Sequence, residues 1–424
     1  MKLKYWFVLA FVGRLILSFG QYHPDLGNHL DWGLKFWQLG PANFYGNSIW
    51  QVSWANQPPG TIYVFALMGL IYKNLTTLVW WLNINLPIFP SAIVPWAEIH
   101  LYPALVKLPF ILSDMGLAIL AGKIVSQLKN EKLGNLITIV FLFNPVFWYI
   151  SAIWGQTESL INLLCLSAIY LFLKNKPYWG IAAFIFSFFF KVSLLIFLPI
   201  FLLWLIKSNE IWWKNLLVVL MVPLVMTLFS LPFTGGGNPL LWIYHLYLDR
   251  VIGHQGNMLT ANAFNLWAFI YGIDFTRTDL IKPFLLNLKQ WGVLLFGISY
   301  LIIYINLLKK KVNNFDFLIS MVLVAFSSFL FLTNMHERYL YPAVVLLSIF
   351  SCWRKNILLV YLFICIIWLL NLYHLWFYPR IDWLIGLYVP TTIKVLSSFN
   401  LLLFGYLVVI LFKSELFVKS SPKV

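Results

Sequence analysis

The chain has little charge and few acidic residues. Of its 424 residues only 10% are charged, with 14 Asp and Glu against 29 Lys and Arg. Hydrophobic residues make up 61% and aromatic residues 19%. Soluble globular domains carry about 25% charged residues, so the composition excludes that class. It indicates a protein that resides in a membrane.

Cysteine is also scarce. Cys165, Cys352 and Cys365 each lie inside an apolar run. Neither metal-ligand spacing nor a pairing pattern is present, so we predict that they are small core residues. The sequence shows no Gly-rich phosphate-binding loop and no cluster that predicts a metal site. We therefore expect no cofactor, with a role for a divalent metal left open.

Long apolar runs recur along the whole chain, and they do not alternate as barrel strands do. We predict an all-α, polytopic membrane protein forming one domain over residues 1–424, with roughly 12–14 transmembrane helices. No small-residue cleavage site follows the first run, so it is predicted to be a span and not a signal peptide. The predicted spans are 5–20, 58–73, 75–90, 104–123, 133–150, 158–173, 178–206 divided in two at Lys191, 215–233, 290–308, 315–333, 339–353, 356–373 and 396–412.

The lysines of the short loops predict the topology. Turns such as 174–176 ("KNK") and 309–311 ("KKK") fall on one side, as the positive-inside rule requires. The net charge of +15 therefore does not indicate nucleic-acid binding. Both termini, including a basic tail at 413–424, are predicted to be cytoplasmic, and the membrane is predicted to be a bacterial plasma membrane. Loops on the opposite, outer side are rich in Trp, Tyr, Asn, Asp and His, and there we expect the chemistry: 21–57, 91–103, 151–157, 234–262, 334–338 and 374–395.

The first outer loop, 21–57, is predicted to contain an amphipathic helix on the membrane surface. Leucines recur at helical spacing from Leu26 to Leu34. Asp25 begins this helix, where it either caps the helix or acts as a general base held at the surface. Asp31 is six residues further on, about 240° around a helix. The two carboxylates are therefore not expected to act as a pair.

Three ionisable residues are predicted within spans. Lys107 and Asp114 are seven residues apart and share a helix face, but two turns is too far for direct pairing, so we expect separate partners. Lys191 interrupts an aromatic and aliphatic run, at a cost of about 2.5–3.5 kcal/mol near a span centre. It either extends to the surface or binds an anion, and a ligand phosphate is the functional alternative.

Four further polar residues have two interpretations each. Gln156 and Glu158 are either polar residues of a hairpin turn or part of a site. Gln57 precedes two prolines that begin a helix, and it could line a polar cavity. Asn262 and Asn265 either bind ligand hydroxyl groups or cap a short helix.

The densest ionisable cluster is "MHERYLYP" at 335–342. Arg338 offers a planar fork suited to phosphate. His336 adds a donor that titrates near neutral pH, and Glu337 could orient either neighbour. The alternative is an interfacial salt bridge at the start of a span.

Taken in order, these segments resemble the GT-C glycosyltransferases, most closely bacterial mannosyltransferase-like members. The family's motifs are matched along most of the chain. Glu158 stands where Asp is commoner, Val192 follows Lys191 where Pro is usual, and no motif aligns after residue 375. The matching segments are "DLGNHLDW" (25–32), "PPGTIY" (58–63), "KLPFILSD" (107–114), "FNP" (143–145), "WGQTE" (154–158), Lys191, "NAFNLW" (262–267) and "MHERYLYP".

The resemblance implies an enzyme of GT-C-type architecture. Such enzymes take a sugar, here mannose or glucose, from a polyprenyl-phosphate carrier on the outer face. The acceptor hydroxyl belongs to a glycan, a lipid or a protein. Asp25 matches the general base, and Arg338 and His336, with Lys191, match residues that hold the carrier phosphate. The remaining matched residues are expected to support the substrates: Gln57, Lys107, Asp114, Gln156, Glu158, Asn262, Asn265, Glu337 and Tyr341.

Two other functions fit part of the pattern. A transporter or flippase of lipid-linked sugars should show internal repeats and polar residues near the midplane. The sequence shows no repeat, and its polar motifs gather at one interface, which favours the enzyme. A lipid-linked oligosaccharide polymerase or ligase would share the topology but use a pyrophosphate donor.

Overall fold

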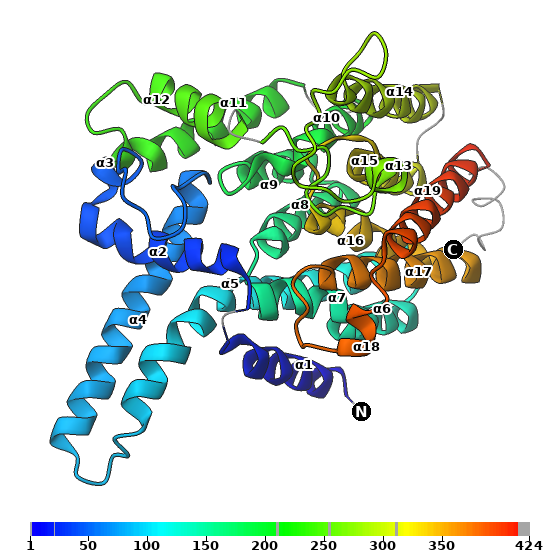
Figure 1. Cartoon of the computed structure of the whole chain (residues 1–424). Helices are drawn as coiled ribbons and strands as arrows, with labels where there is room; N and C mark the ends of the chain where they lie inside the picture. Colours follow the sequence, from blue (N-terminus) through cyan, green and yellow to red (C-terminus); the bar gives the residue numbers. More distant parts are fainter. Residues whose placement is uncertain (1, 21, 209–211, 253–255, 310–312, 414–424) are drawn as a thin grey trace. The chain divides into compact units, whose positions relative to one another are not determined.

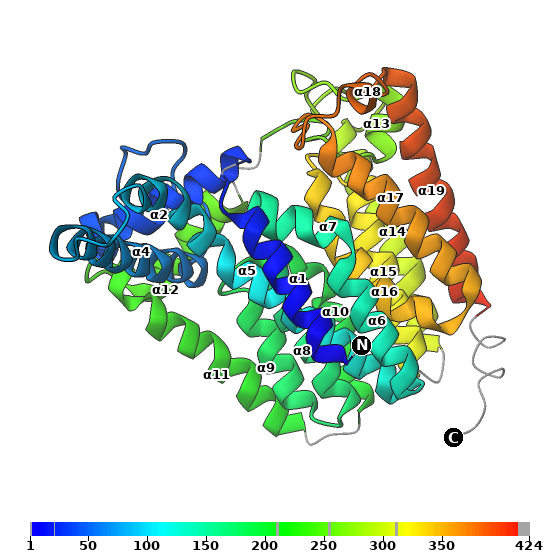
Figure 2. The same cartoon turned by 90° about the horizontal axis from the view of Figure 1, so that it is seen from below.

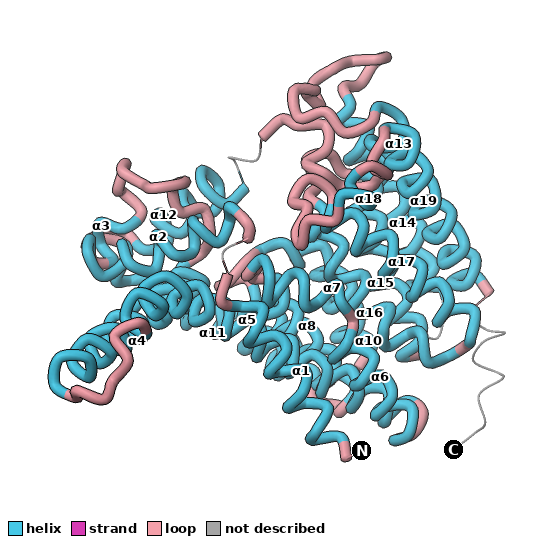
Figure 3. Tube along the Cα trace, turned by 60° about the horizontal axis from the view of Figure 1, so that its bottom comes forward, coloured by secondary structure: helices cyan, strands magenta, loops and turns pink. Residues whose placement is uncertain are grey.

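The computed structural model describes residues 2–20, 22–208, 212–252, 256–309 and 313–413. Over these residues every regular element is a helix, and β pairing is limited to isolated bridges (Figure 3). Within this described part of the chain, six helices are long and apolar enough to cross a membrane, or seven if one bent pair is counted. The prediction of an all-α, polytopic membrane protein is confirmed. The tail at 414–424 lies outside the described residues.

The chain divides into two compact units. The first comprises Met1–Leu120, Thr138–Leu194 and Ile211–His254, and the second comprises Ala121–Ile137, Leu195–Glu210 and Gln255–Val424. That they form one domain stays a prediction. Three elements include residues of both units: α5 (Ile93–Leu128), α6 (Glu131–Phe143) and the 3₁₀ helix η2 (Val192–Phe197).

In the first unit two long helices, α4 (Pro59–Asn85) and α5, form an antiparallel hairpin (Figure 1). Its other elements are α1 (Leu3–Ser18), α2 (Pro24–Leu39), α3 (Pro41–Phe44), α7 (Pro145–Trp148), the π-helix η1 (Tyr149–Trp154), α8 (Glu158–Leu173), α9 (Pro177–Ser187), α11 (Trp212–Ser230), η3 (Leu231–Phe233), α12 (Pro239–His245) and η4 (Leu246–Ile252).

The second unit packs around α15 (Asn314–Phe331), most of which is buried. The predicted spans 290–308, 315–333, 356–373 and 396–412 are confirmed as helices. The unit comprises α10 (Leu198–Lys207), α13 (Leu266–Tyr271), α14 (Leu288–Lys309), α15, η5 (Glu337–Leu340), α16 (Tyr341–Phe350), η6 (Ser351–Trp353), α17 (Lys355–Tyr373), α18 (Asp382–Ile385) and α19 (Pro390–Phe412).

The predicted helix in the first outer loop is confirmed as α2. Pro24 occupies its first turn, and the helix ends at Gly40, whose φ of 72° favours glycine. Leu26, Trp32 and Phe36 are buried in one apolar cluster with residues of α4. One face of α2 therefore fixes the helix within the first unit.

Two predicted spans are wrong in the α4 region. Residues 58–73 and 75–90 were expected to be separate, with a turn at Lys73, but α4 is one continuous helix of 27 residues. Lys73 is exposed on its surface, and a long side chain can leave an apolar face without ending the helix. The outer loop predicted at 91–103 is also wrong, because α5 begins at Ile93 and continues through Pro103.

The predicted span 339–353 is not one helix. Its centre is α16, only 10 residues long and buried on every side, flanked by the 3₁₀ helices η5 and η6. A run this short and apolar is typical of a core helix. The long loop at 234–262 likewise contains two helical segments, α12 and η4.

Candidate functional site

In the first unit, several of the predicted polar residues contact one segment of the chain, residues 151–159. The segment leaves the π-helix η1, turns at Gly155 with a φ of 72°, and enters α8 at Glu158. π-helical turns are rare and occur often at functional sites. All nine residues are buried, so their polar groups need partners inside the protein.

Asp25 is held by this segment. The Gln156 Nε2 donates a hydrogen bond of 2.9 Å to Asp25 Oδ2, and the carboxylate side chain stays 32% exposed. The cap of α2 is His23 and not Asp25, because His23 Nδ1 accepts the backbone N–H of Asp25 at 3.1 Å. The capping interpretation of Asp25 is therefore wrong, and its carboxylate is oriented by an amide instead.

Two histidines that the sequence analysis missed support this arrangement. His23 lies over Trp154, with 4.4 Å between ring centroids. His29 is buried, stacks on Phe65, and donates from Nδ1 to the Gly155 carbonyl at 3.1 Å. The segment "YHPDLGNHLDW" could have indicated these two histidines, because they flank Asp25 at the start of the predicted amphipathic helix.

Gly155 allows this close approach. A Cβ there would lie 2.8 Å from Lys107 Cγ and 3.0 Å from Leu26 Cδ1. Its φ is also in the left-handed region that side chains disfavour. The glycine of "WGQTE" therefore lets the turn pass between α2 and α5.

Lys191 and Glu158 form an ion pair. The Lys191 ammonium donates to Glu158 Oε1 at 2.6 Å, and the two side chains are only 15% and 4% exposed. An anion at Lys191 was one of the two predictions from the sequence, but Glu158 was not predicted to be that anion. The anion present is this carboxylate.

The start of α4 positions the backbone before Lys191. Gly60 N–H donates to Phe189 O at 3.0 Å, and Thr61 Oγ1 donates to Phe190 O at 2.7 Å. A Cβ on Gly60 would lie 2.5 Å from Phe189 O. The predicted interruption at Lys191 is confirmed, since α9 ends at Ser187 and η2 begins at Val192.

Lys107 and Asp114 have separate partners, as predicted. Lys107, fully buried, donates to the carbonyls of Ser18 and Gly20 at 3.1 and 2.5 Å. These carbonyls belong to the last residue of α1 and to the chain just after it, where a cation is favourable. Lys107 therefore fixes the C-terminal end of α1, where the segment that leads to α2 begins.

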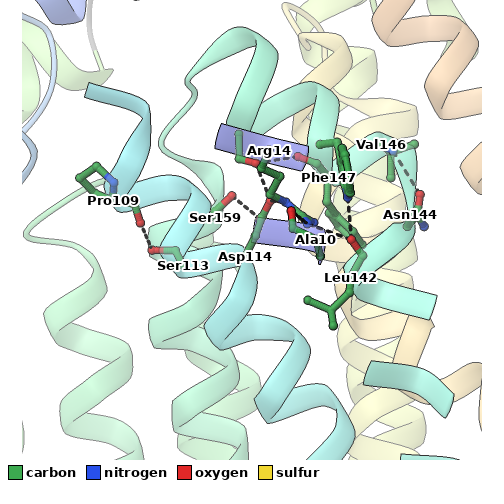
Figure 4. Close-up of polar contacts among 12 residues, drawn as sticks. Ala10, Arg14, Pro109, Ser113, Asp114, Leu142, Asn144, Val146, Phe147 and Ser159 are labelled. Atoms are coloured by element: carbon green, nitrogen blue, oxygen red, sulfur yellow. Dashed lines mark hydrogen bonds and ion pairs between the residues drawn. The ribbon is translucent and has the colours of Figure 1, made fainter. Parts of the chain in front are cut away.

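Asp114 belongs to a buried ion pair. Its Oδ2 lies 3.5 Å from Arg14 Nε, and it accepts hydrogen bonds from Ser151 at 2.5 Å and Ser159 at 2.7 Å (Figure 4). Arg14 also donates to Leu142 O at 2.9 Å. The sequence analysis missed Arg14, although a lone arginine in an apolar run predicts a buried partner.

Asp31 and Gln57 lie apart from this arrangement. Asp31 Oδ2 accepts Gln51 N–H at 3.0 Å and lies 3.8 Å from Lys35 Nζ. Its partners differ from those of Asp25, as the helical geometry predicted. Gln57 contributes its backbone carbonyl, which accepts the Tyr45 hydroxyl at 2.6 Å. Burial raises the pKa of Tyr45 above its ordinary value.

In the second unit, residues 334–336 pair with residues 259–262. Ala261 N–H donates to Met335 O at 3.0 Å, and Asn334 N–H donates to Leu259 O at 3.2 Å. Asn334 and Asn262 both have positive φ, 56° and 73°. These short bridges hold the backbone that carries His336.

Tryptophans surround Glu337, which is 1% exposed. Trp368 Nε1 donates to the Glu337 carbonyl at 2.8 Å, and Trp376 Nε1 donates to its Oε1 at 3.3 Å. The residues on each side of Trp376, Leu375 and Phe377, have positive φ, a costly conformation that is enriched at functional sites. Trp376 was not predicted, because no motif covered that region.

His336 and Arg338 flank Glu337 and are half-buried. The Arg338 guanidinium lies over the Tyr339 ring, 5.5 Å from its centroid. The His336 ring meets the same tyrosine edge to face at 5.3 Å. Tyr341 is fully buried and packs against Trp368, so it supports this segment from the core.

Asn262 and Asn265 make structural hydrogen bonds. The Asn265 Oδ1 accepts the N–H groups of Trp267 and Ala268, which caps α13. The Asn262 Oδ1 accepts from His374 Nδ1 at 2.6 Å, and its Nδ2 donates to His374 O. The capping interpretation is confirmed for Asn265. Burial lowers the pKa of His374 to about 4.

Among the described residues, no group of three or more His, Cys, Asp or Glu could hold a metal ion. In comparisons with known proteins, no family model and no curated protein matches the chain. The predicted residues divide between the units: Asp25, Gln57, Lys107, Asp114, Gln156, Glu158 and Lys191 lie in the first, and Asn262, Asn265, His336, Glu337, Arg338 and Tyr341 in the second.

Proposed function

We propose that the chain is an inverting GT-C-type glycosyltransferase. It transfers a hexose, mannose or glucose, from a polyprenyl-phosphate carrier to an acceptor hydroxyl at the outer face of the plasma membrane. The observation that carries this proposal is the Asp25 carboxylate, which is oriented by Gln156 yet still one-third exposed. A general base needs both a fixed direction and access to its substrate.

The proposed step is a direct displacement. Asp25 accepts the proton of the acceptor hydroxyl while that oxygen attacks the anomeric carbon of the hexose. The bond between this carbon and the carrier phosphate oxygen breaks, and the lipid phosphate leaves with the electron pair. Attack from the opposite face inverts the anomeric configuration. No cofactor is required, and a divalent metal bound to the donor is compatible with the step.

His336 and Arg338 are proposed to bind the carrier phosphate. A planar guanidinium and a ring N–H neutralise charge that develops on the leaving oxygen. Their backbone is paired with 259–262, and Glu337 between them is bonded to two tryptophans. Such support keeps donors aimed without reorganisation during the reaction.

Arg338→Lys tests this role without removing the charge. We expect about a tenfold loss of apparent donor affinity, because lysine lacks the bidentate fork. Titration with polyprenyl-phosphate mannose measures it. Unchanged affinity would contradict the assignment of Arg338 to the carrier phosphate, and a lowered melting temperature beside it would identify a structural salt bridge instead.

Lys191 is proposed to bind phosphate of the lipid carrier, as the resemblance implies. Its pairing with Glu158 holds the ammonium in a fixed direction within an apolar stretch. Gln156 and Glu158 thus orient the base and the cation, respectively. Lys107 and Asp114 act as supports, since both are fully buried.

The finer topology, with 12–14 spans and cytoplasmic termini, is also part of this proposal. It requires that several apolar helices shorter than an ordinary membrane-spanning helix contribute to spans.

The test is consumption of a defined donor. Purified protein is reconstituted in vesicles and incubated with a panel of polyprenyl-phosphate sugars and extracted cell-envelope acceptors. We expect one hexose donor to yield free polyprenyl phosphate and a product of inverted configuration. Movement of the intact donor across the bilayer without cleavage would support the transporter instead, and consumption of only pyrophosphate-linked donors would support the polymerase or ligase.

A further inference from the structure

The first unit has an apolar groove outside the proposed site. It measures about 500 Å³, within the range of pockets that hold small molecules. Helices α9 and α11 lie side by side along it in both views (Figures 1 and 2). Its surface is almost entirely apolar, so its occupant must be a hydrocarbon.

The sequence of α9 makes this groove. Gly180 faces α8, and a Cβ there would lie 2.5 Å from Phe172 Cδ2, so this face of α9 packs closely. Another stripe of α9 carries Trp179, Ala182, Ala183 and Phe186, at the i, i+3, i+4 and i+7 spacing of one helix face. The two alanines form a low floor between larger aromatic side chains.

The other wall comes from α11. Met221 and Val225 line the groove and are 47% and 37% exposed. Phe189, beyond the C-terminal end of α9, contacts Phe229 of α11. The groove is therefore closed towards Phe186 and leads the other way, towards the start of α9.

That other end is basic. Leu171 and Trp179 line the groove on either side of the α8–α9 turn, whose Lys174 and Lys176 are both exposed. No Asp or Glu occurs between Glu158 and Glu210, so no acidic residue of this stretch offsets the two lysines. Trp179 is 65% exposed, as is typical of tryptophans at the level of lipid headgroups.

We propose that this groove binds an anionic phospholipid. One acyl chain lies on Ala182 and Ala183, and the headgroup phosphate contacts Lys174 and Lys176. Basic residues at the end of an intramembrane helix pair are a recurring means of holding such headgroups. The site is separate from Asp25 and Lys191 in the residues it uses, and it does not depend on the proposed glycosyl transfer.

The experiment is native mass spectrometry of the purified full chain, titrated with phosphatidylglycerol or phosphatidylcholine of matched chains. Lys174→Gln with Lys176→Gln is expected to weaken phosphatidylglycerol binding about tenfold. Ala183→Phe, which fills the floor, should weaken it to a similar extent with both lysines present. Lys282→Gln with Lys289→Gln removes the same charge from two other exposed positions and should leave binding unchanged.

Three results would overturn the proposal. Equal binding of phosphatidylglycerol and phosphatidylcholine would show that the lysines do not select the headgroup. Undiminished binding to the Ala183→Phe variant would show that the acyl chain of the lipid does not lie on Ala182 and Ala183. An equal loss of phosphatidylglycerol binding in the Lys282→Gln, Lys289→Gln control would show that only the net charge of the protein matters. Far-UV circular dichroism matched to the wild type verifies that each variant is folded.

Discussion

Two carboxylates of the first unit are held by the same segment, yet their surroundings differ. Asp114 is fully buried, lies against Arg14, and accepts hydrogen bonds from Ser151 and Ser159. Asp25 accepts an amide hydrogen bond from Gln156, lies 3.9 Å from His23 Nδ1, and is one-third exposed. A buried carboxylate whose charge is met by fixed partners is structural, because removing one partner leaves an uncompensated charge. One that is oriented by a hydrogen bond and keeps access to solvent can accept a proton.

Removing the cation from the buried carboxylate should have the largest effect on stability. Arg14→Met leaves the Asp114 charge in a site without its guanidinium, and a broken buried pair costs about 3–5 kcal/mol. The change in thermal stability of the detergent-solubilised protein measures it. The paired variant Arg14→Met with Asp114→Leu should recover part of the loss, because it removes both charges. A paired variant no better than the single one would mean that the contact is not an ion pair.

Glu158→Gln should destabilise the protein less. The Lys191 side chain keeps some exposure, so solvent screens the remaining charge, and we expect about 2 kcal/mol. A double-mutant cycle with Lys191→Met isolates the coupling between the two. A coupling near zero would show that Lys191 finds its counter-charge elsewhere. In that case Glu158 would differ from Asp114, because it would not be a buried carboxylate held in an ion pair.

Gln156→Leu should affect activity more than stability. It removes the amide that directs Asp25, and misplacement of a catalytic group by small distances is costly to the rate. We expect about a tenfold fall in kcat, with a melting temperature close to the wild type. Turnover in the donor-consumption assay measures the first and a thermal scan the second. Gln156→Glu is unsuitable as a control because it adds a like charge, whereas Gln51→Leu, at an exposed position, should change neither quantity.

The sequence predicts the class of the molecule well. Long apolar runs indicated helices, and the isolated Lys191 correctly marked a break between two of them. Amphipathic spacing located α2. The errors have one cause: charge and length alone do not show where a helix ends. Lys73 suggested a turn inside α4, and a buried ten-residue helix, α16, resembled a span.

The sequence predicted which residues belong to the candidate site, but it did not predict which of them contact one another. The pairs Glu158 with Lys191 and Gln156 with Asp25 join positions 33 and 131 residues apart, which no local pattern relates. His29 and Trp376 were missed because each contacts the site through the N–H of a ring. Lone rings in an aromatic-rich chain give no periodic signal. Arg14 was the exception, since its charge within an apolar run could have identified it.

The most direct test is turnover by Asp25→Asn compared with Asp31→Asn. Asparagine keeps the shape of the carboxylate and can still accept the Gln156 hydrogen bond, but it cannot take a proton. We predict a fall in kcat of about 10²–10⁴-fold for Asp25→Asn, with donor binding and melting temperature retained. Asp31→Asn should remain within a few fold of the wild type. Retained turnover in Asp25→Asn would contradict the assignment of Asp25 as the base.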